Sequence, residues 1–316
     1  MKTVVIRHEL PEWTDWCVDR LSAEFPEHEF RAAHSLEEAL DHAPDAHAFI
    51  GIGPKMTPQL VASMPKLEWV QSLTTGIDNL LAMPEMPSGL PISKVTGVQA
   101  PQMSELALTL MFALARRLPA VLSAQARGEW DRRPQSLLHG KTVCLLGLGR
   151  IAETLALYCR TLGMEVTGIS GRDGAPNVDR IYPRERLLEA ASEADFLVVL
   201  IPLSAATRHI VGKSVLDAMK PTAFLINIAR GGCVDEVALL EALENGTIAG
   251  AGIDVFETEP LPPDSPLWTA PNAILTAHVG GFADTYHQQC YPTMLANCRT
   301  YLEQGPDALT DAVRKP

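Results

Sequence analysis

The middle of the chain alternates short apolar runs with amphipathic stretches. The apolar runs are rich in Val, Ile and Leu and nearly continuous, as expected for strands buried on both faces. They lie at residues 142–146, 166–170, 196–201, 223–228, 250–256 and 273–277. The stretches between them have helical spacing and lie at 150–162, 184–191, 213–219 and 235–244. This strand–helix–strand order predicts an α/β fold with a doubly wound parallel sheet.

The first hundred residues repeat this alternation more weakly. Ser35 followed by Glu38 forms a capping box, which predicts the start of a short helix. Three prolines and a glycine within residues 83–91 predict a loop. Strands are expected at 3–6, 48–52 and 68–72.

A long helix is predicted at 101–118, with Pro101 near its start and Pro119 after its end. We place a domain junction there, because 316 residues are too many for one small core. Residues 284–305 have helical spacing and are expected to pack back onto the first domain.

A glycine loop follows the strand that ends at residue 146. It reads Gly147-Leu148-Gly149-Arg150-Ile151-Ala152 and opens a helix. In a G-x-G-x-x-A loop the first glycine makes the turn, the second lets a pyrophosphate approach, and the small third residue packs helix on strand. The order of strands and helices around it favours a dinucleotide site over an empty glycine-rich turn.

The tip of the next strand carries Ser170 rather than an acidic residue. An acid there would hold the ribose 2′-hydroxyl of NAD, whereas Arg172 can pair with a 2′-phosphate and Ser170 can donate a hydrogen bond to it. We therefore expect NADP(H) to be preferred, with NAD(H) possible. Two alternatives stay open: Arg172 is a solvated loop charge, or Asp173 binds the ribose and restores NAD use.

Three polar residues follow the carboxyl ends of predicted strands, where parallel sheets bind ligands: Arg230, Glu259 and His278. A protonated His278 can give a proton to a carbonyl oxygen, and Glu259 beside it would raise the pKa of the imidazole. Arg230 can hold a substrate carboxylate with its planar fork. Each alone has a structural alternative, such as a core histidine or a surface charge, and Asp254 either holds the nicotinamide carboxamide or caps a strand end.

Composition excludes several other classes of function. The formal net charge is −12, which gives no reason to bind nucleic acid or an anionic membrane. The apolar stretch 106–115 is too short to span a bilayer, and no secretory signal is visible, so a cytoplasmic location is expected. No histidine or cysteine spacing predicts a metal site, and the scattered cysteines are expected to be reduced and mostly buried.

On these motifs the chain resembles the D-isomer-specific 2-hydroxyacid dehydrogenases, and most closely their glyoxylate/hydroxypyruvate reductase-type members. The matching motifs span roughly residues 100–285 in the order expected for that family. They are Gly147–Ala152, Asn227–Gly232, Gly252–Phe256 leading to Glu259-Pro260-Leu261, Pro266-Leu267-Trp268, and Thr276-Ala277-His278.

The resemblance implies a Rossmann cofactor domain, residues 101–284, inserted into a smaller flavodoxin-like substrate domain made of residues 1–100 plus 285–316. It implies a homodimer built around the helix at 101–118. Arg230, Glu259 and His278 would be catalytic, and Thr75 and Gly76 would bind the substrate together with Arg230 and His278. The cofactor would contact Gly147, Gly149, Arg150, Ile151, Ser170, Arg172, Pro202, Ile228, Ala229, Arg230, Asp254, His278 and Gly280.

The expected reaction moves a hydride between NADP(H) and a small 2-oxo or D-2-hydroxy acid, with glyoxylate or hydroxypyruvate as the expected substrate. Ser170 departs from the family's usual acid, and Ala277 stands where the family usually has proline. Two alternatives remain: a dinucleotide-sensing binding protein of the corepressor type, and an enzyme that oxidises a non-carbon acid anion such as phosphite.

Overall fold

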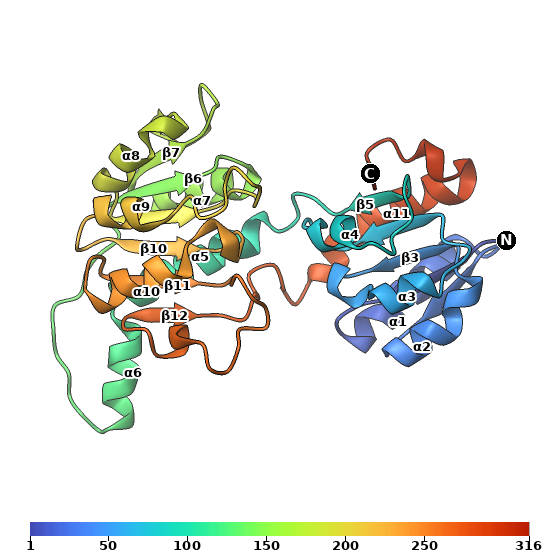
Figure 1. The fold of residues 1–316 in the computed structure, drawn as a ribbon, viewed down its shortest axis with the longest axis horizontal. Helices are drawn as coiled ribbons and strands as arrows, with labels where there is room; N and C mark the ends of the chain where they lie inside the picture. The colour runs from blue at the N-terminus through green and yellow to red at the C-terminus, as the bar shows by residue number, and fades with distance from the viewer. Residues whose placement is uncertain (316) are drawn as a thin grey trace. The chain divides into compact units, whose positions relative to one another are not determined.

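The computed structural model describes residues 1–315 and divides into two compact units. One unit comprises Met1–Val98 and the segment from Asp284 onward; the other is Gln99–Ala283. In each unit, helices cover both faces of a central sheet (Figure 1). The predicted α/β class with two doubly wound sheets is confirmed.

The first unit has a six-stranded sheet in the order β13-β5-β4-β3-β1-β2. All neighbours are parallel except β13, which runs antiparallel to β5. The strands are β1 Thr3–Arg7, β2 Glu29–Ala32, β3 Ala48–Gly51, β4 Trp69–Ser72, β5 Pro91–Lys94 and β13 Val313–Arg314. The helices are α1 Pro11–Glu24, α2 Leu36–His42, α3 Pro58–Ala62, α4 Asp78–Ala82 and α11 Tyr286–Gln304.

Alternate residues of β1 enter two separate cores. Val4 and Ile6 pack with apolar side chains of α1 and α11, whereas Val5 packs with those of α2, α3 and α4. Because successive side chains of a strand point to opposite faces, both faces of this sheet are covered. The segment 284–305, expected to pack back on this unit, supplies α11 to the first of these cores.

The second unit has a seven-stranded parallel sheet in the order β12-β11-β10-β9-β6-β7-β8. The strands are β6 Thr142–Leu146, β7 Glu165–Ile169, β8 Arg180–Tyr182, β9 Phe196–Val199, β10 Phe224–Asn227, β11 Gly250–Ile253 and β12 Ala273–Leu275. The helices are α5 Ala100–Ala115, α6 Leu118–Ala126, α7 Arg150–Thr161, α8 Leu187–Glu193, α9 Lys213–Ala218 and α10 Glu236–Glu244. Helices α5 and α7 cover one face of this sheet, and α8, α9 and α10 cover the other.

The helix predicted at 101–118 is wrong at its carboxyl end. Two helices cover this region instead of one. Helix α5 stops at Ala115, and Arg117 adopts a positive φ of 52° before α6 begins at Leu118. Pro119 lies in the first turn of α6 instead of after a helix. Proline is disfavoured inside a helix because it lacks the N–H donor, but its fixed φ suits a first turn.

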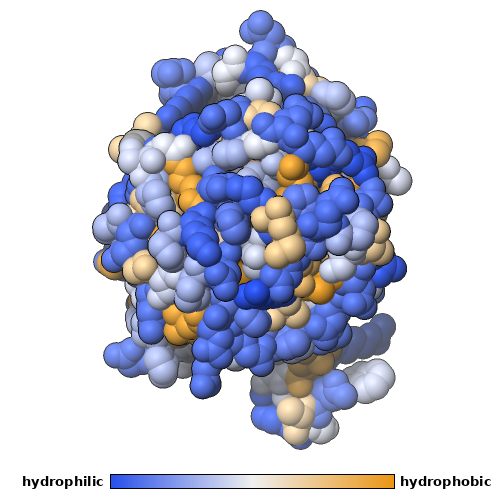
Figure 2. Space-filling view, turned by 90° about the vertical axis from the view of Figure 1, so that its right-hand side faces the viewer, coloured by the Kyte–Doolittle hydropathy of each residue, from blue (hydrophilic) through white to orange (hydrophobic). Residues whose placement is uncertain are grey.

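No single helix within residues 1–315 is long and apolar enough to cross a membrane. Taken together, α5 and α6 pass by length and composition, but they are bent by 62°. Figure 2 shows a face of the molecule on which hydrophilic residues predominate and hydrophobic ones are scattered.

A buried histidine follows β1. The ring of His8 lies 4.7 Å from that of Trp13, and His287 stacks on Trp13 at the same centroid distance. His8 Nδ1 accepts the N–H of Glu9 at 2.7 Å, so the proton of the neutral ring is on Nε2, for which the described residues offer no hydrogen-bond partner. Burial, and then the nearby His287, lower the pKa of His8 to about 4.

This histidine should make the protein less stable in mild acid. Below pH 6.5 this histidine is protonated in the unfolded chain but stays neutral in the folded protein. The contribution of His8 to the free energy of unfolding is therefore largest above pH 6.5 and is lost as the pH drops toward 4. We expect the free energy of unfolding to lose about 2 kcal/mol between pH 7 and pH 5 through this group. Urea unfolding at both pH values measures the total difference, which His8→Gln should reduce by about 2 kcal/mol. The variant His139→Gln, at an exposed position, is the control. Equal losses in wild type and His8→Gln would contradict this account.

Candidate functional site

The glycine loop between β6 and α7 is shaped for close approach of a ligand. Gly147 has a φ of 103°, and a Cβ there would lie 2.7 Å from Cγ2 of Ile201, so glycine is required. At Gly149, the residue before α7, a Cβ would meet no atom within 4 Å. The first N–H groups of a helix lack intrahelical partners. The open space over this helix start therefore fits a pyrophosphate.

The tip of β7 is bonded to this loop. Nη1 of Arg172 donates to the carbonyl oxygen of Leu148 at 2.6 Å and to Oε1 of Glu153 at 2.9 Å. Oγ of Ser170 accepts the N–H of Arg172 at 3.2 Å. The structure thus brings Ser170 and Arg172 beside the glycine loop, and the guanidinium is held there by hydrogen bonds.

The loops after β10 and β11 lie directly against each other at Gly231. A Cβ on Gly231 would lie 1.9 Å from the carbonyl carbon of Phe256 and 2.1 Å from its oxygen. Only a residue without a side chain allows this contact between two backbones. It brings Arg230, which precedes Gly231, close to the segment that leads to Glu259.

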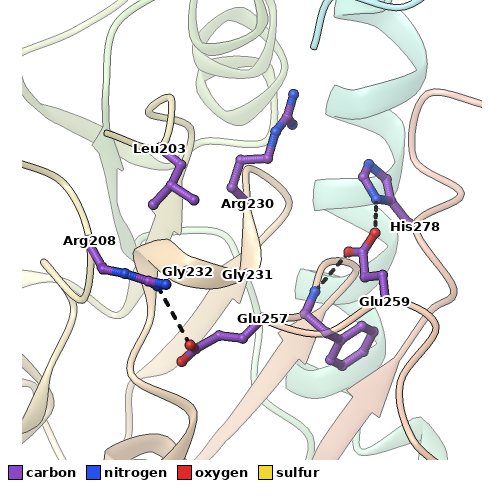
Figure 3. A pocket seen from close by; sticks show the side chains of 9 residues that line it. Leu203, Arg208, Arg230, Gly231, Gly232, Glu257, Glu259 and His278 are labelled. Carbon is purple, nitrogen blue, oxygen red and sulfur yellow. Dashed lines mark hydrogen bonds and ion pairs between the residues drawn. The ribbon is translucent and has the colours of Figure 1, made fainter. Parts of the chain in front are cut away.

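Glu259 and His278 form a hydrogen-bonded pair (Figure 3). Oε2 of Glu259 lies 2.7 Å from Nδ1 of His278, and Oε1 accepts the N–H of Phe256 at 2.9 Å. With Nδ1–H donated to the carboxylate, Nε2 is the ring nitrogen that can exchange a proton with a ligand.

The charges of this pair stabilise each other. The hydrogen bond to Glu259 raises the pKa of His278 above its ordinary value and outweighs the opposing effect of burial; the negative charges of Glu259 and Asp254 add to the increase. Partial burial acts to raise the pKa of Glu259, but hydrogen bonds from His278 and the Phe256 N–H outweigh it, so that pKa is lowered. The arrangement favours an imidazolium beside a carboxylate, which is a poised proton donor.

Asp254 holds the loop that carries His278. The residue is fully buried; Oδ1 accepts from Oγ1 of Thr276 at 2.5 Å and from the N–H of Val279 at 2.9 Å, and Oδ2 accepts from the N–H of Gly280 at 3.0 Å. His278 itself has a φ of 52°, a conformation that costs energy for a residue with a side chain. These bonds hold the strained turn in place. They agree with the alternative in which Asp254 caps the end of a strand.

Arg230 lines the same cleft as the pair. Its Nη1 donates to the carbonyl oxygen of Ala229 at 2.7 Å, and its charge acts on both Glu259 and His278. Figure 3 shows the guanidinium extending past His278 at the edge of the cleft. The cleft has a volume of about 230 Å³ and is lined by Leu203, Arg208, Arg230, Gly231, Gly232, Phe256, Glu257, Glu259 and His278.

The other expected site residues fall in both units. Pro202 is exposed just beyond β9, whereas Ile228 and Ala229 are buried after β10. In the first unit, side-chain hydrogen bonds hold the loop after β4. Oγ1 of Thr75 donates to the carbonyl of Val95, just after β5, at 2.8 Å, and the side chain of Thr74 donates to the carbonyl of Gly76 at 2.8 Å. The roles of Thr75 and Gly76 toward a substrate stay predictions.

Arg208, Glu257 and the packing role of Gly231 were not predicted from the sequence. The pair Gly231-Gly232 directly after a strand was the available signal for a close backbone approach. Nothing in the spacing of Arg208 and Glu257, 49 residues apart, indicated that they share a cleft. Within residues 1–315, no group of three or more His, Cys, Asp or Glu side chains could hold a metal ion.

Comparison with known proteins places this geometry in context. A family model described as D-isomer specific 2-hydroxyacid dehydrogenase, NAD binding domain, matches residues 108–280. The chain is 37% identical over 251 residues to glyoxylate/hydroxypyruvate reductase B of Pectobacterium atrosepticum, covering 77% of this chain and 78% of that protein. It is 34% identical over 272 residues to D-3-phosphoglycerate dehydrogenase of Methanocaldococcus jannaschii. That match covers 83% of this chain but 51% of the relative, so the chain aligns with only about half of it.

Solved structures resemble the whole chain. A D-isomer specific 2-hydroxyacid dehydrogenase family protein from Aeromonas salmonicida has a TM-score of 0.89 at 30% identity, covering 100% of this chain and 99% of the other. An NADPH-dependent glyoxylate/hydroxypyruvate reductase from Sinorhizobium meliloti, in complex with NADP and sulfate, has a TM-score of 0.82 at 26% identity, with the same coverage.

Proposed function

The chain belongs to the D-isomer-specific 2-hydroxyacid dehydrogenase family, and on that premise we propose that it reduces glyoxylate or hydroxypyruvate with NADPH. Membership makes it an NAD(P)-binding oxidoreductase and confirms the resemblance seen in the sequence. The observation that carries the proposal is the 2.7 Å hydrogen bond between His278 and Glu259 in the cleft that also holds Arg230. Relatives named glyoxylate/hydroxypyruvate reductase, at 37% and 26% identity, support the proposed substrate.

The cofactor would lie over the glycine loop, with its pyrophosphate against Gly149 and the first N–H groups of α7. The remaining expected contacts are Gly147, Arg150, Ile151, Pro202, Ile228, Ala229, Asp254 and Gly280. When bound, the reduced nicotinamide supplies a hydride to the carbonyl carbon of the substrate.

The chain's own residues do the rest of the chemistry. Arg230 binds the substrate carboxylate and polarises the carbonyl. The backbone amides of the loop at Thr75 and Gly76 are proposed as hydrogen-bond donors to a carboxylate. His278 gives the proton on Nε2 to the carbonyl oxygen, while Glu259 stabilises the imidazolium through Nδ1. A 2-oxo acid, NADPH and one proton thus become a D-2-hydroxy acid and NADP⁺, and His278 regains its proton from solvent.

We propose that NADPH is preferred because Arg172 and Ser170 meet the 2′-phosphate. Structures of relatives bound to NADP or NADPH support this proposal. Arg172→Ala should raise the KM for NADPH about tenfold to a hundredfold and leave the KM for NADH within twofold, because only NADPH loses a charge-assisted hydrogen bond. Steady-state kinetics with both cofactors measures this.

Two further variants separate the alternatives for this tip. The exposed Arg160→Ala, on α7, removes one positive charge elsewhere and should leave both KM values unchanged. If Asp173→Ala abolished NADH use while Arg172→Ala left NADPH untouched, Asp173 would be the ribose ligand and the preference for NADPH would be wrong.

Glu259→Gln should move the pH profile of reduction. Reduction needs protonated His278, so activity falls as the pH rises through the pKa that Glu259 holds above its ordinary value. Without the carboxylate this pKa drops toward about 6.5, and the fall should occur at lower pH. The profile of kcat/KM between pH 5 and 10 measures the change, with Asp264→Asn, outside the cleft, as the control. An unchanged profile would mean that Glu259 does not set the titration.

We also propose a homodimer, with the contact surface on α6 and the segment after it. The apolar face of α5, which the resemblance implied as the centre of the dimer, is mostly buried within its own unit. In contrast α6 extends away from the sheet of its unit (Figure 1). Large apolar side chains are exposed on this helix and on the segment after it: Leu118, Val121, Leu122, Trp130 and Leu137.

NADPH oxidation with a panel of small 2-oxo acids tests the proposed function. Turnover with glyoxylate and hydroxypyruvate supports a reductase. Tight cofactor binding without turnover on any member of the panel would favour the dinucleotide-sensing alternative. Phosphite-dependent reduction of NADP⁺ would favour an enzyme that oxidises a non-carbon acid anion.

A further inference from the structure

A second arginine lines the cleft and has no part in the proposed reaction. Arg208 lies in the loop between β9 and α9 and is 58% exposed at its side chain. Figure 3 shows it across the cleft from His278, with Gly231 and Gly232 between them. A Cβ on Gly232 would lie 3.2 Å from Nη1 of Arg208, so the absence of a side chain there leaves room for the guanidinium.

The charge of Arg208 is only loosely balanced. Its nearest partner is Oε2 of Glu257 at 3.7 Å, too long for a hydrogen bond. The other oxygen of Glu257 lies 2.9 Å from Nε2 of His209, so the same carboxylate is shared between the two side chains. Within the described part of the chain the Arg208 side chain makes no hydrogen bond, which leaves a fork of N–H donors facing solvent at the cleft.

The catalytic charged groups of the cleft already have partners or a proposed role. The Glu259 carboxylate bonds His278 and the N–H of Phe256, and Arg230 is assigned to the carboxylate next to the reacting carbonyl. The lining of the cleft also includes the apolar residues Leu203 and Phe256. A ligand that fits has an anionic group at each end and methylene groups between them.

Building on the proposed function, we propose that Arg208 is a second anion-binding residue, which extends the substrate class to 2-oxo dicarboxylates of four or five carbons. The 2-oxo acid end binds at Arg230 and His278, and the distal carboxylate pairs with Arg208. A guanidinium fork matches a carboxylate bidentately, so the distal group replaces the long contact to Glu257 with charge-assisted hydrogen bonds.

Matched substrates test the proposal. Reduction of 2-oxoglutarate is compared with that of 2-oxopentanoate, and oxaloacetate with 2-oxobutanoate; each pair has one chain length and differs in the distal carboxylate. Arg208→Gln should lower kcat/KM for both dicarboxylates about tenfold through KM and leave both monocarboxylates within twofold. Glu257→Gln, which removes the competing carboxylate, should act in the opposite direction and lower the KM for the dicarboxylates.

A binding measurement gives a second readout. Calorimetric titration of 2-oxoglutarate into the protein with NADP⁺ present should show the same tenfold loss in Arg208→Gln. Arg186→Gln, on an exposed arginine paired with Glu189, should have no effect. Equal losses for dicarboxylates and monocarboxylates, or a changed KM for NADPH alone, would overturn the proposal.

The reductase activity and the role of Arg208 can be disproved separately. If no 2-oxo acid is reduced by the wild-type protein, the proposed function itself is wrong. If the monocarboxylates are reduced but Arg208→Gln leaves the dicarboxylates unaffected, only the second subsite is wrong.

Discussion

Replacing His278 with Gln is expected to lower kcat about 10³-fold while NADPH still binds. The glutamine keeps a polar side chain in the cleft but cannot carry the proton that the imidazolium donates, and general acid catalysis is worth about 10²–10⁴ in rate. Because the hydrogen bonds of Asp254 hold the loop through Thr276, Val279 and Gly280, the backbone should keep its path in the variant.

Two measurements separate lost chemistry from lost structure. Single-turnover oxidation of NADPH gives the rate of the chemical step, and fluorescence titration gives the dissociation constant of NADPH. His139→Gln, in an exposed position, serves as the control. A variant at position 278 that retains more than a tenth of the wild-type rate would show that another group donates the proton.

Arg230→Ala is expected to lower kcat/KM for hydroxypyruvate by about 10²–10³, because the substrate carboxylate loses a bidentate, charge-assisted partner. Arg230→Lys restores the charge but not the planar fork, so it should recover only part of the loss. The comparison of these two variants separates charge from geometry.

The measurement is steady-state kinetics, with Arg186→Ala as a control that removes an arginine outside the cleft. Guanidinium added to the Arg230→Ala reaction should restore part of the activity, because the space and the negative partner remain. Near-normal kcat/KM in Arg230→Ala would contradict the role given to this residue.

The core of the site could be predicted because parallel sheets place the carboxyl ends of their strands at one edge. Arg230, Glu259 and His278 each follow such an end, at separations of 29 and 19 residues along the chain. Their positions needed only the strand order. The pairing of Glu259 with His278 followed from chemistry, and the structure brings the two within 2.7 Å.

Features that depend on packing were out of reach. The helix α1 was missed although Trp13, Cys17 and Leu21 lie four residues apart on its buried face, because charged residues interrupt the pattern. The break at Arg117 was missed because Pro119 fits both the end of one helix and the first turn of another. Strands were predicted too long where apolar residues continue into buried loops, as at Phe256 after β11.

Contacts between loops could not be predicted from the sequence either. The contact of Gly231 with the backbone of Phe256 and the bonds of Asp254 to the His278 loop join segments that are 25 or so residues apart. Both depend on atomic distances between neighbouring strand ends. They decide whether the catalytic groups meet, and they became visible only in three dimensions.

Hydride transfer to the substrate is tested by following deuterium during reduction of hydroxypyruvate with NADPH that carries deuterium at both C4 positions. We expect D-glycerate with one deuterium at C2, formed in equal amount to the NADP⁺ produced, and a rate that falls about 10³-fold in His278→Gln. Oxidation of the cofactor without label at C2, or no glycerate at all, would contradict it.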